Sequence, residues 1–175
     1  METLGAYQRT SALQPPGNKP VYTARKACRK FIAEERMTLI VFVCLDDNNG
    51  MMFNKRRQSR DRCVLTDMLR ESAGSVLWMN AYSATLFPKE DGAAVRIDER
   101  FMEKAAPGEF CFAENVQICP YEERIEKLVL YRWNRNYPYD LQFDLPLENH
   151  GWKRAETAEF KGSSHEKITK ETYIK

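Results

Sequence analysis

Residues 37–49, Met-Thr-Leu-Ile-Val-Phe-Val-Cys-Leu-Asp-Asp-Asn-Asn, decide the fold of this chain. The apolar run has the length of a strand and does not alternate with polar residues, which predicts a strand buried on both faces of a sheet. It ends in Asp-Asp-Asn-Asn-Gly, a sequence that favours a turn. Since ligands bind open α/β sheets at the carboxyl ends of the strands, we expect a site beside this turn.

Further apolar runs alternate with segments of helical spacing along the rest of the chain. Short strands are expected at residues 76–79, 94–97, 109–113 and 128–131. Short helices are expected at 64–71, at 82–87, at 101–105 with Asp98 as the cap, and from Pro120 onward. Residues 152–160 and 168–174 predict a hairpin at the sheet edge. The expected fold class is α/β, with a mostly parallel central sheet, an antiparallel C-terminal hairpin and flanking short helices.

Residues 1–36 differ in composition from the rest of the chain. They carry seven Lys/Arg against three Asp/Glu, whereas residues 37–175 carry 20 against 22. Pro15-Pro16-Gly17 and the low apolar content predict a disordered or helical basic leader. This leader would be a targeting or nucleic-acid-binding arm, or it would be an extension without a role. The clean start of the domain at Met37 favours the extension without a role. We expect one domain over residues 37–175, without the basic field of a general nucleic-acid binder.

Cysteine usage and hydropathy narrow the class of protein. The five cysteines form no C-x-x-C pair, which favours a reducing, cytoplasmic compartment. No stretch approaches about 18 apolar residues, so no membrane partner is expected. The N-terminus lacks the apolar core of a secretory signal.

The order of the expected elements resembles the dihydrofolate reductase family. Leu39–Leu45 matches that family's first strand, and Gly50–Asn54 resembles its mobile active-site loop. Leu77–Ser83 falls where the family has a strand, a glycine, an arginine and a threonine that opens a helix. Ile125–Tyr131 matches its passage from helix to strand, and Trp152–Tyr173 its C-terminal hairpin. The resemblance implies a dihydrofolate-reductase-like fold over residues 37–175 and NADPH as the cofactor.

The residue that donates the proton in this family is replaced. The resemblance places the catalytic carboxylate at about Val64, and a valine cannot protonate a pterin. Asp61 and Asp67 lie one turn away on either side and are the remaining candidates for catalysis. The simpler interpretation is that Asp61 caps the helix and that Asp67 lies on its solvated face.

The residues expected to hold the cofactor also differ. The family's paired glycines let the backbone approach the dinucleotide, and Ala113-Glu114-Asn115 stand at that place. A glutamate there adds bulk and negative charge beside phosphates. Asn80-Ala81 replace a glycine and a phosphate-binding arginine, and only Ser83 keeps a hydroxyl. Residues 84–108 are too few for the family's adenosine site, so these departures argue against NADPH.

Residues 55–62, Lys-Arg-Arg-Gln-Ser-Arg-Asp-Arg, form a basic loop after the first strand. Arg56, Arg57 and Arg60 would bind a small anionic or nucleotide-like ligand, because the planar guanidinium suits phosphate. The opposite wall would consist of residues after the second and third strands, namely Asn80, Tyr82, Ser83, Glu114 and Asn115. The same loop can bind RNA, or it can be only a solvated surface.

The histidines argue against a metal centre. This chain also resembles proteins known as tRNA-processing ribonuclease Z, which implies RNA processing. Such enzymes hold zinc in an H-x-H-x-D-H cluster, and this chain has only His150 and His165, far apart. We expect His165 to be a surface donor in the hairpin turn, with a site role as the alternative. Asp46-Asp47 could ligate magnesium, although a turn is favoured, and no metal is expected.

Three functions therefore remain open. The first is a reductase-like scaffold that binds a ligand and is non-catalytic. The second is a diverged NADPH-dependent reductase of a pterin-like substrate, and the third is RNA processing. Binding of NADPH separates the first two.

We predict that residues 1–36 are dispensable for folding, because they contribute little apolar surface to the core. A chain that begins at Met37 should unfold at the same temperature as the full chain. A melting temperature lower by more than ~5 °C, about 1 kcal/mol for a domain of this size, would mean that the leader packs on the domain.

Overall fold

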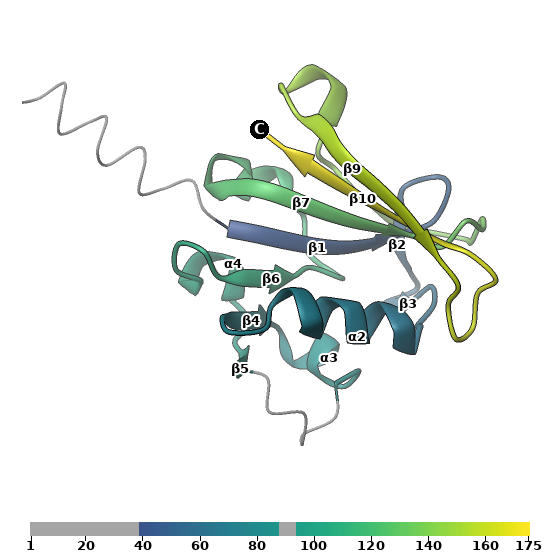
Figure 1. Cartoon of the computed structure of the whole chain (residues 1–175), viewed down its shortest axis with the longest axis horizontal. Coiled ribbons are helices and arrows are strands. Elements are labelled where there is room, and N and C mark those ends of the chain that lie inside the picture. The colour runs from purple at the N-terminus through teal and green to yellow at the C-terminus, as the bar shows by residue number, and fades with distance from the viewer. Residues whose placement is uncertain (1–38, 88–93) are drawn as a thin grey trace, which may run out of the picture.

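The structure is a computed structural model that describes residues 39–87 and 94–175. Its centre is a seven-stranded sheet with the order β5-β4-β6-β1-β7-β10-β9 (Figure 1). The strands are β1 (Leu39–Leu45), β4 (Val76–Met79), β5 (Ala94–Ile97), β6 (Phe110–Phe112), β7 (Ile125–Arg132), β9 (Lys153–Phe160) and β10 (Ile168–Ile174). All the strands expected from the sequence are present. The leader expected at residues 1–36 lies outside the described residues.

The sheet is parallel except at its C-terminal edge. β1 runs parallel to β6 and β7, and β4 runs parallel to β5 and β6. β10 is antiparallel to both β7 and β9, so the C-terminal hairpin forms one edge of the sheet. The expected mostly parallel sheet with an antiparallel C-terminal hairpin is confirmed.

The central strand β1 is buried on both faces, as its uninterrupted apolar sequence predicts. Side chains alternate between the two faces of a strand. Val41 packs into one core cluster with Phe101, and Phe42 packs into a second cluster with Val64 and Met68. The second cluster lies under the longest helix, which crosses one face of the sheet (Figure 1).

The helices are short. They are α2 (Arg62–Glu71), α3 (Ala81–Ala84), α4 (Phe101–Lys104), and the 3₁₀ helices η1 (Cys119–Arg124) and η2 (Leu147–Asn149). Asp61 is the N-cap of α2, as expected. The expectation that Asp98 caps α4 is wrong: Arg100 occupies the cap position, and Asp98 accepts from its N–H at 2.9 Å. Within the described residues, no helix is long and apolar enough to cross a bilayer.

A second, three-stranded sheet was not expected from the sequence. It contains β2 (Gly50–Phe53), β3 (Arg56–Arg57) and β8 (Leu141–Gln142) in the order β3-β2-β8. Asn54 and Lys55, at the β2–β3 turn, have φ values of 49 and 59°, the left-handed region used by tight hairpin turns. A lysine is unusual there, so the turn was not recognised. The loop expected over the site is therefore a hairpin.

Asp46 organises the turn at the carboxyl end of β1, and its side chain is fully buried. One carboxylate oxygen accepts from the N–H groups of Asn48 at 2.9 Å and Gly50 at 2.6 Å. The other accepts from the Tyr137 N–H at 3.0 Å and the Gln58 amide at 3.2 Å. The side chain thus joins three segments of the chain at the edge where a ligand is expected.

Asp46→Asn is predicted to lower the free energy of unfolding by about 2 kcal/mol, because an amide offers one acceptor oxygen and leaves buried donors unpaired. Thermal unfolding should show a melting temperature roughly 5 °C lower. The matched control is Asp47→Asn at the exposed neighbouring position, with an expected change within about 0.5 kcal/mol. Equal effects of the two substitutions would show that the Asp46 carboxylate does not hold the turn.

Candidate functional site

Arg57 joins the β2–β3 hairpin to α3 at the carboxyl edge of the sheet. Its backbone N–H donates to the Tyr82 hydroxyl at 2.8 Å, and its Nη2 donates to the Tyr82 carbonyl at 3.0 Å. The guanidinium carbon also lies 4.5 Å from the centre of the Tyr82 ring, within the range of a cation–π contact. Arg57 is therefore part of a wall and not a free side chain of the basic loop.

Glu114, which follows β6, pairs with this arginine. Its Oε1 lies 3.2 Å from Arg57 Nε, and its Oε2 accepts from the Ser83 hydroxyl at 2.9 Å. Burial raises the pKa of Glu114, while the positive charge of Arg57 and the hydrogen bond from Ser83 act in the opposite direction. The acidic side chain is thus compensated inside the protein.

Asn80 and Asn115 complete this network. Asn80 is the N-cap of α3, where its side-chain oxygen accepts from the Ser83 N–H at 3.0 Å. Its amide nitrogen donates to the Asn115 side chain at 2.6 Å. The structure therefore brings together six of the residues singled out in the sequence, which are Arg57, Asn80, Tyr82, Ser83, Glu114 and Asn115. Their polar groups bond to one another.

The other two arginines singled out in the sequence lie outside this network. Arg56 is exposed on β3 opposite Phe53, and Arg60 is exposed just before α2. The basic loop is consequently divided by the fold: Arg57 turns inward, and its neighbours face solvent.

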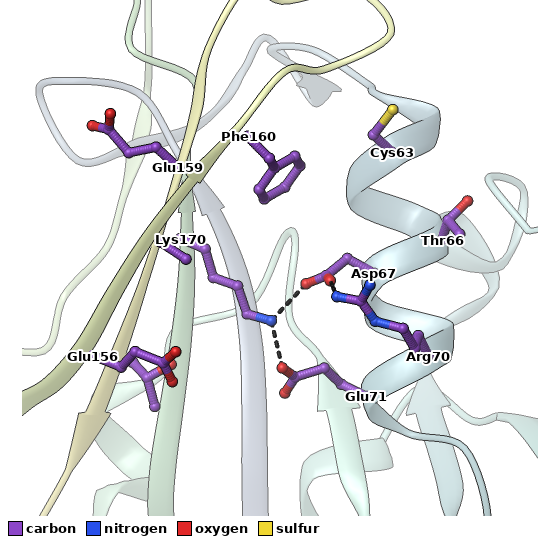
Figure 2. Close-up of a pocket in the computed structure, with 11 residues that line it drawn as sticks. Cys63, Thr66, Asp67, Arg70, Glu71, Glu156, Glu159, Phe160 and Lys170 are labelled. Carbon is purple, nitrogen blue, oxygen red and sulfur yellow. Dashed lines mark hydrogen bonds and ion pairs between the residues drawn. The ribbon is translucent and has the colours of Figure 1, made fainter.

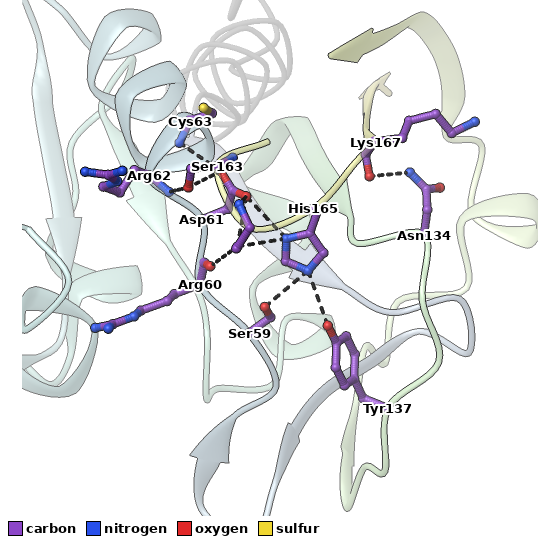
Figure 3. Close-up of polar contacts among 11 residues, drawn as sticks. Ser59, Arg60, Asp61, Arg62, Cys63, Asn134, Tyr137, Ser163, His165 and Lys167 are labelled. Atoms are coloured by element: carbon purple, nitrogen blue, oxygen red, sulfur yellow. Dashed lines mark hydrogen bonds and ion pairs between the residues drawn. The ribbon is translucent and has the colours of Figure 1, made fainter. Parts of the chain in front are cut away.

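Asp61 is the centre of a second network, shown in Figure 3. It caps α2 through the Cys63 N–H at 2.9 Å and also accepts from the N–H groups of Ser163 at 2.9 Å and Ser164 at 2.8 Å. Burial by itself raises the pKa of Asp61, but these hydrogen bonds, with one from His165, outweigh it and hold the pKa well below its usual range. An ionised carboxylate therefore fastens the hairpin turn to the start of α2.

His165 lies inside this network, and the expectation of a surface donor is wrong: its side chain is 2% exposed. Its ring stacks on Trp133 with 4.8 Å between centroids. Its Nδ1 is 3.2 Å from Asp61, and its Nε2 is 3.2 Å from both the Ser59 and the Tyr137 hydroxyls. The tertiary structure buries it because the turn folds back over the start of α2.

A groove of about 580 Å³ lies beside Asp61, between α2, the end of α3 and the hairpin turn. We call it the arginine-rimmed groove. Its lining includes Leu65, Leu69 and Leu86, which are half-buried, and Arg60, Arg62 and Ser163, which are exposed. It combines an apolar floor with a cationic rim.

A second groove, of about 560 Å³, lies between α2 and the C-terminal hairpin (Figure 2). Asp67 lines it, and the expectation that Asp67 is solvated is wrong: it is buried and accepts from Tyr131 at 2.8 Å and Lys170 at 2.6 Å. Arg70 pairs with the same carboxylate, and Lys170 also pairs with Glu71. The charged groups of this groove are thus largely paired with one another.

The position expected for a proton donor is apolar in three dimensions as well. Val64 is 1% exposed and packs in the core under α2.

His150, the remaining histidine, bonds to Glu122 at 2.7 Å. Within residues 39–87 and 94–175, no group of three or more His, Cys, Asp or Glu side chains is placed to hold a metal ion.

The structure is similar to a solved structure. A dihydrofolate reductase from Enterococcus faecalis, complexed with NADP(H) and RAB-propyl, aligns with a TM-score of 0.57 over 79% of this chain and 96% of that chain, at 10% identity. The fold is that of dihydrofolate reductase. At this identity the likeness establishes the fold alone. No family model matches the sequence, and no curated protein matches it either.

Sequence reasoning missed several residues of the second network. Ser59 and Arg62 were noted only as members of a basic loop, and Tyr137 was not singled out. The only available signal was the pair Ser163-Ser164 beside His165 in the hairpin turn, because short hydroxyl side chains often bond to nearby backbone or carboxylate groups. Their common partner, Asp61, lies about a hundred residues earlier and could not be inferred locally.

We predict that this dihydrofolate reductase fold neither binds NADPH tightly nor reduces dihydrofolate. At the turn where the sequence resemblance expects glycines the chain has Glu114, and at the position expected for the acid it has Val64, which has no ionisable proton to donate. Titration of the purified chain with NADPH, followed by an assay of NADPH oxidation with dihydrofolate, checks both expectations. A dissociation constant in the low micromolar range, or steady oxidation, would contradict them. A genuine dihydrofolate reductase assayed in parallel is the positive control.

Proposed function

We propose that this protein is a dihydrofolate-reductase-like scaffold that binds a small anionic, nucleotide-like ligand and is non-catalytic as a reductase. The observation that carries the proposal is the arginine-rimmed groove, in which an apolar floor adjoins two exposed guanidinium groups. It opens beside the start of α2, next to the carboxyl edge of the sheet, where such folds bind ligands.

The floor of the groove suits a flat or apolar ligand body. Leu65 and Leu69 lie one turn apart on α2, and Leu86 faces them from the segment after α3. All three are half-buried against the core, so a ligand placed on them covers apolar surface that would otherwise contact water. Pockets of this kind, with few polar groups at the rim, are typical of small-molecule sites.

The rim suits an anion. Arg60 and Arg62 are exposed, and within the described residues neither guanidinium forms an ion pair. A guanidinium can donate two hydrogen bonds to one phosphate or carboxylate. Arg62 was not expected from the sequence, and in this proposal it takes the role first given to Arg57.

Arg57, Tyr82 and Glu114 then serve as a supporting wall. Because Glu114 is buried and Arg57, which is half-buried, is already paired with it, the pair offers little charge to a ligand. A dinucleotide that approached this turn closely would have to displace the pair and leave Glu114 uncompensated, which is unfavourable for a buried charge. This supports the binding proposal over the diverged NADPH-dependent reductase.

Binding of RNA through the basic loop would require the arginine side chains to act together along an extended path. A chain of nucleotides would need cationic groups along a path together with stacking surfaces. The inward orientation of Arg57 interrupts that path, so a single small anion fits the observations better.

We predict that Arg60→Gln with Arg62→Gln weakens binding of nucleoside monophosphates by at least about tenfold, because charge-assisted hydrogen bonds to the anion are lost. Isothermal titration calorimetry with a panel of nucleoside monophosphates and a short single-stranded RNA provides the measurement. The melting temperature should stay unchanged, since both side chains are exposed.

The matched control is Arg100→Gln with Arg135→Gln, which removes the same charge from exposed positions outside the groove. Equal losses in the two double variants would show that only net charge matters. Unchanged affinity in the groove variant would overturn the proposal, and a loss confined to the RNA would favour the RNA alternative.

A further inference from the structure

Ser59, His165 and Asp61 lie next to one another (Figure 3), and Asp61 also lines the arginine-rimmed groove. The Ser59 Oγ lies 3.2 Å from His165 Nε2, and His165 Nδ1 lies 3.2 Å from Asp61 Oδ2. The three residues come from the segment after β3, the turn between β9 and β10, and the cap of α2. This is the order of contacts of a nucleophile, a base and a carboxylate that orients the base.

The hydrogen bonds determine which nitrogen of the ring carries the proton. Asp61 accepts five further hydrogen bonds, from the N–H groups of Cys63, Ser163 and Ser164 and from the two serine hydroxyls. It is therefore an acceptor, and Nδ1, which lies 3.2 Å from this carboxylate and 3.1 Å from the Ser164 hydroxyl, is the donor toward it. In that tautomer Nε2 presents its lone pair to the two hydroxyl groups, as a general base requires.

The position of the ring is fixed. Trp133 stacks on the His165 ring, with 4.8 Å between the ring centroids and an interplanar angle of 19°. The His165 side chain is buried. A base held on one face by an indole and at one edge by a carboxylate loses little freedom when it acts. Ser59 itself is half-buried.

Two hydroxyls compete for one lone pair. The Ser59 and Tyr137 oxygens both lie 3.2 Å from His165 Nε2, which can accept one strong hydrogen bond. When Ser59 donates to the ring, the Tyr137 proton is free to point toward a bound group. Tyr137 is thus placed to donate to negative charge that develops next to Ser59.

We propose that Ser59, His165 and Asp61 form a nucleophilic triad that hydrolyses carboxylic esters, with Tyr137 as the donor to the oxyanion. The Ser59 Oγ bonds to the ester carbonyl carbon while its proton passes to His165 Nε2. The bond from that carbon to the alkoxide oxygen breaks, and His165 returns the proton to the leaving oxygen. A water molecule then gives a proton to the same nitrogen while its oxygen bonds to the acyl carbon. The bond from that carbon to Ser59 Oγ breaks, the nitrogen returns the proton to this oxygen, and the acid leaves. Hydride transfer and NADPH have no part in this activity.

The test uses the full chain, a fluorophosphonate probe and p-nitrophenyl acetate. The probe should label Ser59, identified by mass spectrometry of the digested protein. Ser59→Ala should abolish that label and lower ester hydrolysis by about a hundredfold or more. Ser75→Ala is the matched control, because Ser75 is also half-buried but donates only to a backbone carbonyl. It should leave labelling and hydrolysis unchanged.

Tyr137→Phe provides a second measurement that a purely structural network would not produce. It removes only the hydroxyl and keeps the aromatic ring, so it should lower the rate of hydrolysis about tenfold or more while the melting temperature changes little. A folded chain in which Ser59 stays unlabelled, or in which Ser59→Ala hydrolyses the ester as fast as the unaltered chain, overturns the proposal. Nucleotide binding at the groove is measured separately, so the outcome does not decide the proposed function.

Discussion

The Asp61 carboxylate is the interaction on which the edge of this molecule depends. It ends the loop after β3, begins α2 and holds the turn of the C-terminal hairpin through two backbone N–H groups. Because these donors come from both halves of the chain, α2 and the β9–β10 hairpin have a fixed relation to each other. The arginine-rimmed groove and the His165 network both exist because of that relation.

The same edge of the sheet shows how the structure accommodates an acidic side chain inside the protein. The turn after β6 holds Glu114, whose charge is compensated by Arg57 and by the hydroxyl of Ser83. Val64 of α2 lies in the core, at the position where the sequence resemblance placed a carboxylate, so no polar group is buried there without a partner.

Much of the fold could be predicted because it depends on local patterns. The apolar run of β1, the helical spacing of Val64 and Met68, and the cap at Asp61 are all visible in a few neighbouring residues. The β2–β3 hairpin was missed because Lys55 adopts a left-handed conformation that lysine rarely takes. Asp98 was misplaced by two residues because an aspartate can bond to the N–H two residues on without being the helix cap.

The sequence by itself determined the strands, their order in the chain, and the parallel sheet with its antiparallel edge. Burial and backbone preference depend on short segments of sequence, so they can be predicted without knowing which distant residues a segment will contact. Only the tertiary structure decided that Arg57 turns inward to Glu114, that Asp67 is buried with Tyr131, and that His165 meets Asp61. A polar side chain takes whatever partner packing brings within about 3 Å, and these partners come from distant parts of the chain.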